Sequence, residues 1–364
     1  MGASGNKVLV AMSGGVDSSV AAGLLKEAGY DATGVFMCLG SAGAGHETGA
    51  RSCCSPEDAA DARMVADHLK IPLYVLDFSR EFEAIIENFV NEYRSGKTPN
   101  PCVLCNSRIK FGRLAAHATS LGIQKIATGH YARVQECPEP AIMRGKNRAK
   151  DQSYALWAVL REVLGRMLLP IGQTGGKPEV RAIANRMGLK VHDKPDSQEI
   201  CFVPDDDYAA FLRSKCPDAL KPGRLMDTSG KVLGNHAGHA TFTIGQRRGI
   251  GAAGVTTGEP MYVIRIDPSD ATVVIGPRAE AMSTKLVATQ ANWHQDMPAA
   301  FDATVQIRYN HEGAPARVRK LDNGGFEADF EKPVFAVTPG QSAVCFDGEI
   351  LLGGGTIEDN NGPQ

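Results

Sequence analysis

Short apolar runs alternate with longer stretches of helical periodicity through the first part of the chain. The apolar runs cover 8–12, 30–39, 73–78 and 125–134, and the helical stretches cover 20–28, 55–70 and 81–93. Short apolar runs are typical of buried strands, and strands that alternate with helices favour a parallel sheet with helices on both faces. We therefore expect an α/β fold with a doubly wound parallel sheet.

The pattern changes beyond about 221, where runs of apolar residues are short and are separated by glycines. This pattern predicts β structure, and a domain boundary is expected near 211–222. From about Met282, polar and apolar residues alternate in runs such as 303–309, which favours a small antiparallel barrel. The expected domains are a nucleotide-binding domain at 1–215, a β-rich domain at 216–281 and a C-terminal barrel at 282–364.

The first strand and helix are joined by Ser13–Ser19, which begins Ser-Gly-Gly and includes Asp17. Glycines let the backbone approach an anion, the helix N-terminus is positive, and three serine hydroxyls add donors, so we expect a phosphate site. No lysine follows the glycines, which excludes a Walker A loop. Asp17 can instead hold a cation that neutralises departing pyrophosphate. The alternative is an ordinary strand-turn-helix corner.

Nucleotides bind parallel sheets at the carboxyl ends of the strands. Met37 and Gly129 fall at the ends of two further predicted strands, so we expect both to lie near the loop. A second glycine pattern, Gly-x-Gly-x-x-Gly at 249–254, precedes a β-like run rather than a helix. It is therefore rejected as a dinucleotide fingerprint.

Two cysteines, Cys102 and Cys105, follow Asn100-Pro101, which can cap and begin a helix. A helix N-terminus lowers the pKa of a thiol, so both are candidate reactive thiolates. The alternative is half of a zinc site, but no second Cys-x-x-Cys completes it. Cys201 ends a polar run and, taken alone, fits a small buried hydrophobe equally well.

Composition agrees with a globular protein of two or three domains. The 364 residues are 43% hydrophobic and 22% charged, without an apolar run long enough to cross a membrane and without a signal-peptide pattern. Nine cysteines in such a chain indicate reduced thiols and a cytoplasmic location. The net charge of -2 does not indicate a nucleic-acid partner, although basic residues cluster at 144–150, 247–248 and 317–320. Each cluster alone favours a solvated surface.

Several segments together resemble the tRNA-specific 2-thiouridylase family, over essentially the whole chain. They are Ser13–Ser19, Phe36-Met37, Thr98–Pro101, Leu104–Asn106, Gly129–Tyr131, Lys150–Tyr154, Ser197–Phe202 and Gly245–Gly249. The resemblance implies that ATP is bound, with Mg²⁺, by Ala11, Met12, Ser13, Gly14, Gly15, Val16, Asp17, Ser18, Met37 and Gly129. It implies that tRNA is contacted by Asn100, Pro101, Cys102, His130, Lys150, Asp151, Gln152, Arg308, Tyr309 and Gln341.

The resemblance also implies a reaction. The C2 oxygen of the wobble uridine, in tRNAs that accept lysine, glutamate or glutamine, is adenylated, and a persulfide on Cys201 supplies the sulfur. Cys105 is then the partner nucleophile, able to form a disulfide with Cys201. A separate protein donates the persulfide sulfur, and no membrane is involved.

One residue departs from the family pattern, since Cys102 stands where the family commonly has aspartate. This substitution raises the hypothesis that Cys102, Cys105 and Cys201 ligate an iron-sulfur cluster. Two other functions stay open. An adenylating ligase that uses ammonia or an amine needs no cysteine pair, and a non-catalytic tRNA-binding protein does not need Asp17.

Overall fold

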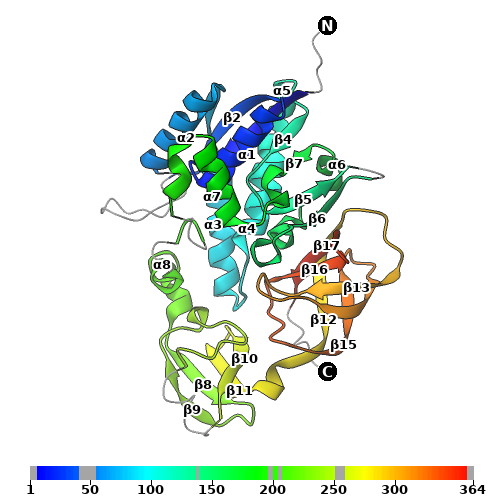
Figure 1. Cartoon of the computed structure of the whole chain (residues 1–364). Coiled ribbons are helices and arrows are strands. Elements are labelled where there is room, and N and C mark those ends of the chain that lie inside the picture. The colour runs from blue at the N-terminus through cyan, green and yellow to red at the C-terminus, as the bar shows by residue number, and fades with distance from the viewer. Residues whose placement is uncertain are drawn as a thin grey trace. The chain divides into compact units, whose positions relative to one another are not determined.

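The computed structural model describes residues 6–40, 55–136, 139–195, 200–203, 207–250 and 259–358. The chain divides into two compact units (Figure 1). Unit 1 comprises Met1–Ile85, Cys102–Asp206 and Glu349–Leu351, and unit 2 comprises Ile86–Pro101, Asp207–Gly348 and Leu352–Gln364. No helix within the described ranges is both long and apolar enough to cross a bilayer.

Unit 1 contains a five-stranded parallel sheet with the order β3-β2-β1-β4-β7. Its strands are β1 (Lys7–Met12), β2 (Asp31–Cys38), β3 (Leu73–Asp77), β4 (Lys125–Ala127) and β7 (Met167–Leu168). The order runs outward in both directions from β1, so a topological switch point lies beside β1, where such sheets bind ligands. The expected doubly wound parallel sheet is confirmed.

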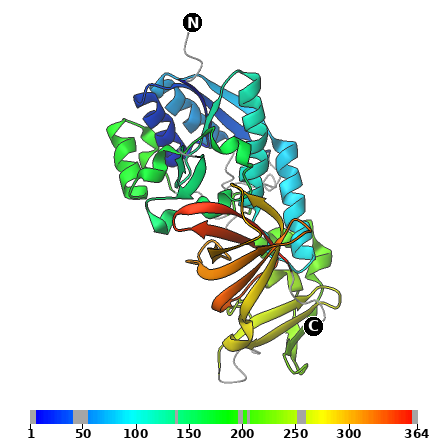
Figure 2. The ribbon, with the colours of Figure 1, turned by 90° about the vertical axis from the view of Figure 1, so that its right-hand side faces the viewer.

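Helices cover both faces of this sheet. The α-helices described between 16 and 186 are α1 (Val16–Glu27), α2 (Pro56–Leu69), α3 (Ser79–Arg94), α4 (Pro101–Leu104), α5 (Leu114–Ser120), α6 (Arg161–Leu164) and α7 (Lys177–Arg186). In Figure 2, α1, α2 and α7 lie on one face and α5 lies on the other. Val8 and Val10 of β1 are fully buried against α1, α2 and α7, because strand residues two apart point to the same face.

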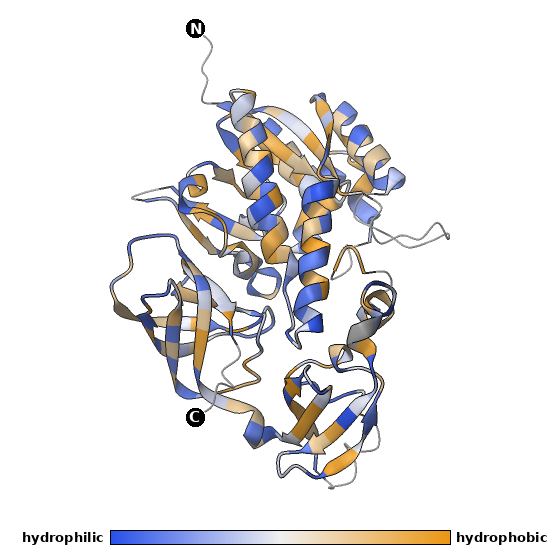
Figure 3. Cartoon of the chain, turned by 180° about the vertical axis from the view of Figure 1, so that it is seen from behind, coloured by the Kyte–Doolittle hydropathy of each residue, from blue (hydrophilic) through white to orange (hydrophobic). Residues whose placement is uncertain are grey.

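The sequence specifies α2 through a capping box at its start and α3 through the spacing of its apolar residues. At the start of α2, Asp58 N donates to Ser55 Oγ at 3.1 Å and Ser55 N donates to Asp58 Oδ2 at 3.3 Å, which is a capping box. In α3 the buried Phe82, Ile85 and Phe89 recur at intervals of three or four. Figure 3 shows the resulting apolar and polar sides of α3.

The expectation of one strand over 125–134 is wrong. The chain forms β4, leaves the sheet, and forms β5 (Ala132–Gln135), which pairs with β6 (Ala141–Arg144) in an antiparallel hairpin. The break occurs at Gly129, where a Cβ would lie 2.7 Å from the backbone nitrogen of Ser18. Close approach to the start of α1 therefore takes priority over continued strand pairing.

Unit 2 includes α8 (Tyr208–Lys215) and a four-stranded sheet with the order β10-β11-β8-β9. The strands are β8 (Gly223–Asp227), β9 (Val232–His236), β10 (Met261–Asp267) and β11 (Thr272–Pro277). Their apolar side chains form one core, in which Val263, Val273 and Ile275 are fully buried. The expected β-rich central segment is confirmed.

Strands that follow this sheet in the sequence form a closed antiparallel barrel, seen in orange and red in Figure 2. Its strands are β12 (Met282–Trp293), β13 (Ala300–Gln306), β14 (Ala314–Lys320), β15 (Phe326–Phe335), β16 (Ser342–Asp347) and β17 (Ile350–Ile357). The order is β12-β15-β14-β13-β16-β17, and β12 pairs with β17 to close the ring. Closure leaves no unpaired edge between these strands, and it confirms the expected barrel. The expected domain limits at 215 and 281 stay predictions.

Candidate active site

The loop between β1 and α1 has the shape of an anion-binding turn. Gly14 has a φ of +73°, and a Cβ there would collide with the carbonyl oxygen of Asp58, so the position requires glycine. Gly15 is the N-cap of α1 and provides no side-chain cap. An uncapped helix N-terminus offers its amides and its positive dipole end to an anion. The loop therefore fits a phosphate group.

The buried serines of the loop serve the turn itself, which corrects the expectation that all three hydroxyls donate to the anion. Ser18 Oγ donates to the Gly15 carbonyl at 3.1 Å, and Ser19 Oγ donates to the same oxygen at 2.8 Å. Ser18 Oγ also accepts a hydrogen bond from Ser13 N at 3.1 Å. The hydroxyls of Ser18 and Ser19 are thus used to fix the loop, whereas Ser13 is exposed.

The other predicted nucleotide residues surround this loop at the carboxyl edge of the sheet. Ala11 and Met12 end β1 and are buried, Val16 begins α1, and Met37 lies at the end of β2. Gly129 follows β4 and packs against the backbone of the first turn of α1. The structure brings all these positions together, and their roles toward ATP stay predictions.

Asp17 is held through both carboxylate oxygens. The Tyr131 hydroxyl donates to Oδ1 at 2.7 Å, and the Lys177 ammonium donates to Oδ2 at 2.8 Å. Tyr131 is itself fixed by Gln152: Tyr131 N donates to Gln152 Oε1 at 2.9 Å, and the backbone N–H of Gln152 donates to Tyr131 O at 2.9 Å. The carboxylate therefore has a defined orientation beside the phosphate-binding turn.

A second lysine braces the loop from the other side. Lys194 Nζ donates to the Gly14 carbonyl at 3.2 Å, to Asp58 at 2.6 Å and to Asp61 at 2.5 Å. Burial acts to lower the pKa of Lys194, but the two carboxylates outweigh it and raise the pKa. An ammonium has three donors, and these three acceptors satisfy them. Lys194 is thus a structural brace of the turn.

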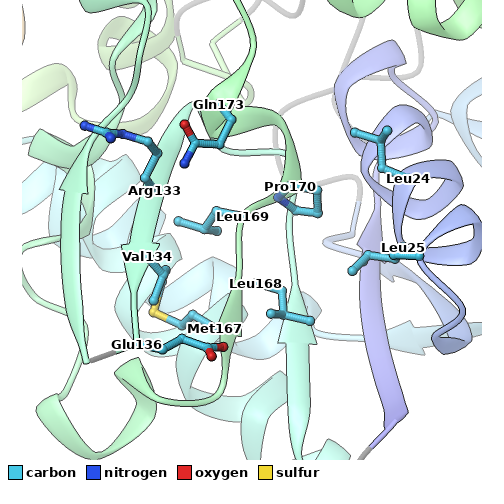
Figure 4. Close-up of a pocket in the computed structure, with 11 residues that line it drawn as sticks. Leu24, Leu25, Arg133, Val134, Glu136, Met167, Leu168, Leu169, Pro170 and Gln173 are labelled. Atoms are coloured by element: carbon cyan, nitrogen blue, oxygen red, sulfur yellow. The ribbon is translucent and has the colours of Figure 1, made fainter. Parts of the chain in front are cut away.

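A surface pocket of about 370 Å³ lies beside the C-terminal half of α1 (Figure 4). Its walls are mainly apolar and include Leu24, Leu168 and Pro170. The guanidinium of Arg133, which also lines it, donates to Glu349 at 2.5 Å. Leu24 is seven residues beyond Asp17, or about 10 Å along the helix axis. The pocket is therefore separate from the glycine-rich loop.

The cysteines at 102 and 105 lie on a helical segment that begins at Pro101, as expected. After the single turn of α4, the segment continues as a π-helix over Cys105–Arg113 and then as α5. In a π-helix the backbone bonds join residues five apart, which brings Lys110 to the side that carries Cys105. Lys110 Nζ donates to Asn106 Oδ1 at 2.9 Å, and Asn106 Nδ2 donates to Ala155 O at 3.0 Å.

Cys201 is placed in the same unit by an aromatic anchor. Phe202 is buried and packs edge-on against Phe82, with the ring centroids 5.7 Å apart. A negative charge on Cys201 contributes to raising the pKa values of Cys102 and Cys105. The structure records Cys105 and Cys201 as thiols. Ser197, Gln198 and Glu199 lie outside the described residues.

The expectation that the helix N-terminus lowers the thiol pKa values is wrong. Cys102 as a whole residue is exposed, but the protein around its thiol hinders hydration of the thiolate and raises its pKa to about 11, with Lys110 opposing the shift. Burial also raises the pKa of Cys105, and here Lys110 is the largest opposing influence. Removal of the charged form from water thus outweighs the dipole of a helix whose α-helical part is one turn long.

The hypothesis of an iron-sulfur cluster is not supported. Within the ranges that the structure describes, which include Cys102, Cys105 and Cys201, no group of three or more His, Cys, Asp or Glu side chains is arranged to hold a metal. Cys102 is exposed at the surface, whereas Cys105 and Cys201 are half-buried. The three cysteines therefore do not form a ligand set in the described part of the chain.

The tRNA-contacting residues expected in unit 1 differ in exposure. Lys150 is exposed, together with Lys146 and Arg148. Asp151 is ion-paired with Arg144 at 3.1 Å, and both side chains are 5–6% exposed. His130 is buried, and its Nδ1 lies 2.6 Å from the Thr128 hydroxyl. Burial, with Lys110 adding to it, lowers the pKa of His130 well below its usual value, so the imidazole is neutral.

The other expected tRNA contacts lie in unit 2. Tyr309 is exposed, and the half-buried Arg308 donates to the Phe335 carbonyl at 2.8 Å. Gln341 Nε2 donates to the Thr98 carbonyl at 2.8 Å, which ties the barrel to the segment that ends in Asn100 and Pro101. The contacts of these residues with RNA stay predictions.

Sequence reasoning missed three side chains that complete the site. Tyr131 and Lys177 hold Asp17, and Lys110 lies beside the thiols. Lys177 could have been noticed, because Gly175-Gly176-Lys177-Pro178 is a helix start that presents a cation. Lys110 could not, because its place depends on a π-helix that the residue pattern does not reveal.

The sheet order and the uncapped glycine-rich turn define a nucleotide-binding domain of the HUP class. Family profiles agree with this architecture. They match "tRNA methyl transferase HUP domain" over 6–205, "tRNA methyl transferase PRC-barrel domain" over 209–277 and "Aminomethyltransferase beta-barrel domain" over 283–357.

Curated relatives cover nearly the whole chain. tRNA-specific 2-thiouridylase MnmA of Carboxydothermus hydrogenoformans is 46% identical, over 97% of this chain and 97% of its own. The protein of the same name from Lachnoclostridium phytofermentans is 44% identical, over 96% of this chain and 99% of its own. The chain belongs to the tRNA-specific 2-thiouridylase family.

Similarity to solved structures is weak. NH3-dependent NAD synthetase from Campylobacter jejuni aligns over 60% of this chain and 77% of its own, with 16% identity and a TM-score of 0.34. A likeness at this level carries no weight for function.

Proposed function

We propose that this protein is an ATP-dependent tRNA-uridine 2-sulfurtransferase that acts on the wobble uridine. The observation that carries the proposal is the glycine-rich turn with its oriented carboxylate, Asp17, in the same unit as Cys105 and Cys201. The names of the relatives support tRNA as the substrate. The proposed acceptors are tRNAs for lysine, glutamate and glutamine, and the proposed location is the cytoplasm.

The turn and its carboxylate fit ATP with Mg²⁺. The amides of the turn and of the first turn of α1 would hold the phosphates, and Asp17 would hold the cation. When bound, ATP supplies the adenylyl group that makes the C2 oxygen of uridine a leaving group and releases pyrophosphate. Ala11, Met37 and Gly129 would enclose the nucleotide at the edge of the sheet.

The cysteines then account for sulfur transfer. Cys201, loaded as a persulfide by a separate donor protein, attacks C2 with its outer sulfur, and AMP departs with the C2 oxygen. Cys105 then attacks the inner sulfur, the Sγ of Cys201. The bond between the two sulfurs of the adduct breaks, 2-thiouridine leaves, and a Cys105–Cys201 disulfide forms. A thiol reductant restores both cysteines, so electrons balance.

Lys110 fits this scheme because a cation beside Cys105 favours its thiolate. The target base must leave its stack to be reached. Asn100, Pro101 and Cys102 are proposed to face it, with Lys150, Asp151, Gln152, His130, Arg308, Tyr309 and Gln341 as further tRNA contacts. The buried ion pair of Asp151 favours a role in shaping this segment rather than direct contact through its carboxylate.

The test is nucleoside mass spectrometry of purified tRNA after incubation with ATP, Mg²⁺ and a persulfide donor. We expect 2-thiouridine with release of AMP and pyrophosphate, loss of product in Cys105→Ser and Cys201→Ser, and most of the product retained in Cys102→Asp, the matched control on the same helical segment. A methylated nucleoside, ADP release, or full activity after alkylation of the thiols would overturn the proposal. Binding of tRNA without any product would favour a non-catalytic role.

A further inference from the structure

Lys177 is bound to the one carboxylate of the glycine-rich turn. Its ammonium donates to Asp17 Oδ2 at 2.8 Å, and the two side chains are 18% and 26% exposed. The other oxygen of Asp17 is held independently by the Tyr131 hydroxyl. The position of Asp17 therefore does not depend on Lys177 alone.

The local backbone fixes where the ammonium lies. Gly176 is the N-cap of α7 with a φ of +107°, and a Cβ there would collide with the side-chain amide of Asn147. Asn147 Nδ2 also donates to the Gly175 carbonyl at 2.6 Å. These contacts direct the start of α7, and thus Lys177, toward the first turn of α1.

Electrostatics indicate what happens when a nucleotide binds. A divalent cation competes with an ammonium for a carboxylate, because its charge is larger and its preferred ligands are anionic oxygens. An ammonium displaced from Asp17 would remain beside the anion-binding turn, next to the phosphates, and lysine is a common phosphate ligand. Lys194 cannot exchange in this way, because Gly14, Asp58 and Asp61 engage its ammonium together.

We propose that Lys177 is a further ATP-binding residue, which neutralises Asp17 in the nucleotide-free protein and turns to the phosphates when Mg²⁺ takes the carboxylate. Tyr131 acts as a positioning residue that keeps Asp17 in place during the exchange. The proposal rests on the proposed use of ATP. It concerns binding, so it can be tested without turnover.

The experiment is isothermal titration calorimetry of the full chain with ATP, once with excess Mg²⁺ and once with EDTA. Lys177→Met is expected to weaken ATP binding roughly tenfold or more in Mg²⁺, because a charge-assisted contact with the phosphates is lost. It is expected to weaken binding in EDTA as well, because no cation then neutralises Asp17 beside the phosphates. Lys177→Arg, which keeps the charge, is expected to retain most of the affinity in both.

Lys125→Met is the matched control. This lysine also lies in unit 1 and is a quarter exposed, but it bonds to Glu136 and to the Gly165 carbonyl. The ATP affinity of Lys125→Met should equal that of the wild type, and circular dichroism should show the same fold for all variants.

Two results separate this proposal from the proposed function. A wild-type protein that binds no ATP overturns both. A wild type that binds ATP, with Lys177→Met unchanged in Mg²⁺ and weakened only in EDTA, overturns the phosphate contact alone, because the lysine would then act only by neutralising Asp17. If Lys177→Met is unfolded, Lys177→Gln is titrated instead: weaker binding in Mg²⁺ supports the phosphate contact, and a loss confined to EDTA contradicts it.

Discussion

Opposing influences set the acidity of Cys105, the two largest being burial and Lys110. Burial disfavours the thiolate and raises the pKa, while the Lys110 cation favours the thiolate and lowers it. Since burial prevails, most of the protein carries a neutral Cys105 thiol near neutral pH. The π-helix is what gives this thiol a cation on the same helix side, five residues along.

The first prediction concerns this cation. Lys110→Met should raise the pKa of Cys105 further and slow its alkylation by iodoacetamide at pH 8 by about tenfold, which is the effect of one pKa unit on the thiolate fraction. In every variant the rate should rise with pH, because a raised pKa leaves the thiol protonated until the pH approaches that value. Mass spectrometry of the peptide that carries Cys105 measures the rate.

Arg113→Met is the control for this prediction. Arg113 ends the same π-helix, but its guanidinium is largely exposed and ion-paired with Glu81 at 2.8 Å. Alkylation of Cys105 should match the wild type in this variant. An equal slowing in Arg113→Met would mean that the helix, rather than the cation, governs the reactivity of the thiol.

At the scale of elements, the sequence pattern predicts most of unit 1 because local signals and packing agree. The Ser55–Asp58 capping box begins α2, and Pro101 begins the cysteine-bearing helix. The pattern does not predict close contacts between two backbone segments. The strand after Lys125 ends early because Gly129 must pack on α1, and no residue periodicity records that approach. The π-helix was missed because its residues also fit an ordinary helix.

The same limit applies to the candidate site. The turn at Ser13–Gly15 is predictable because Gly14 must adopt a positive φ. The partners of Asp17 come from distant segments at Tyr131 and Lys177, so only the folded chain reveals them. The serine hydroxyls were assigned to the anion because a pattern cannot show which local carbonyl competes for them.

Gly129→Ala tests whether this close approach maintains the nucleotide turn. The added Cβ would lie 2.7 Å from backbone atoms of Asp17 and Ser18, so the first turn of α1 must move. We expect ATP affinity to fall at least tenfold and the free energy of unfolding to fall by about 1–3 kcal/mol, the usual cost of overpacking. Calorimetric titration with ATP and thermal unfolding measure the two effects.

Gly234→Ala provides the comparison, because a Cβ at this strand position meets no atom within 4 Å and the backbone has no positive φ. Both its ATP affinity and its stability should stay close to those of the wild type. If Gly129→Ala bound ATP as tightly as Gly234→Ala, the packing of β4 on α1 would have no part in nucleotide binding.

At the scale of the whole molecule, charge is distributed rather than absent. The net charge is -2, yet Lys146, Arg148 and Lys150 form an exposed basic run in unit 1. Arg144, in the same run, is buried and neutralised by Asp151, so it contributes to the fold of the segment instead. A basic run of this kind attracts phosphates by releasing their counterions, which makes binding sensitive to salt.

The last prediction follows from that sensitivity. Lys150→Ala should weaken tRNA binding while leaving ATP binding unchanged, and it should reduce the slope of log affinity against log salt concentration by about one, as expected for the loss of one phosphate contact. Filter binding of tRNA across a series of salt concentrations measures both quantities.

Arg308→Ala should also weaken tRNA binding. This side chain additionally donates to the Phe335 carbonyl, so the effect combines the loss of an RNA contact with a change in the fold. Lys26→Ala, an exposed lysine in the last turn of α1, is the control and should leave the slope unchanged. If the slope of log affinity against log salt concentration were equal in wild type and Lys150→Ala, this lysine would not contact tRNA phosphates.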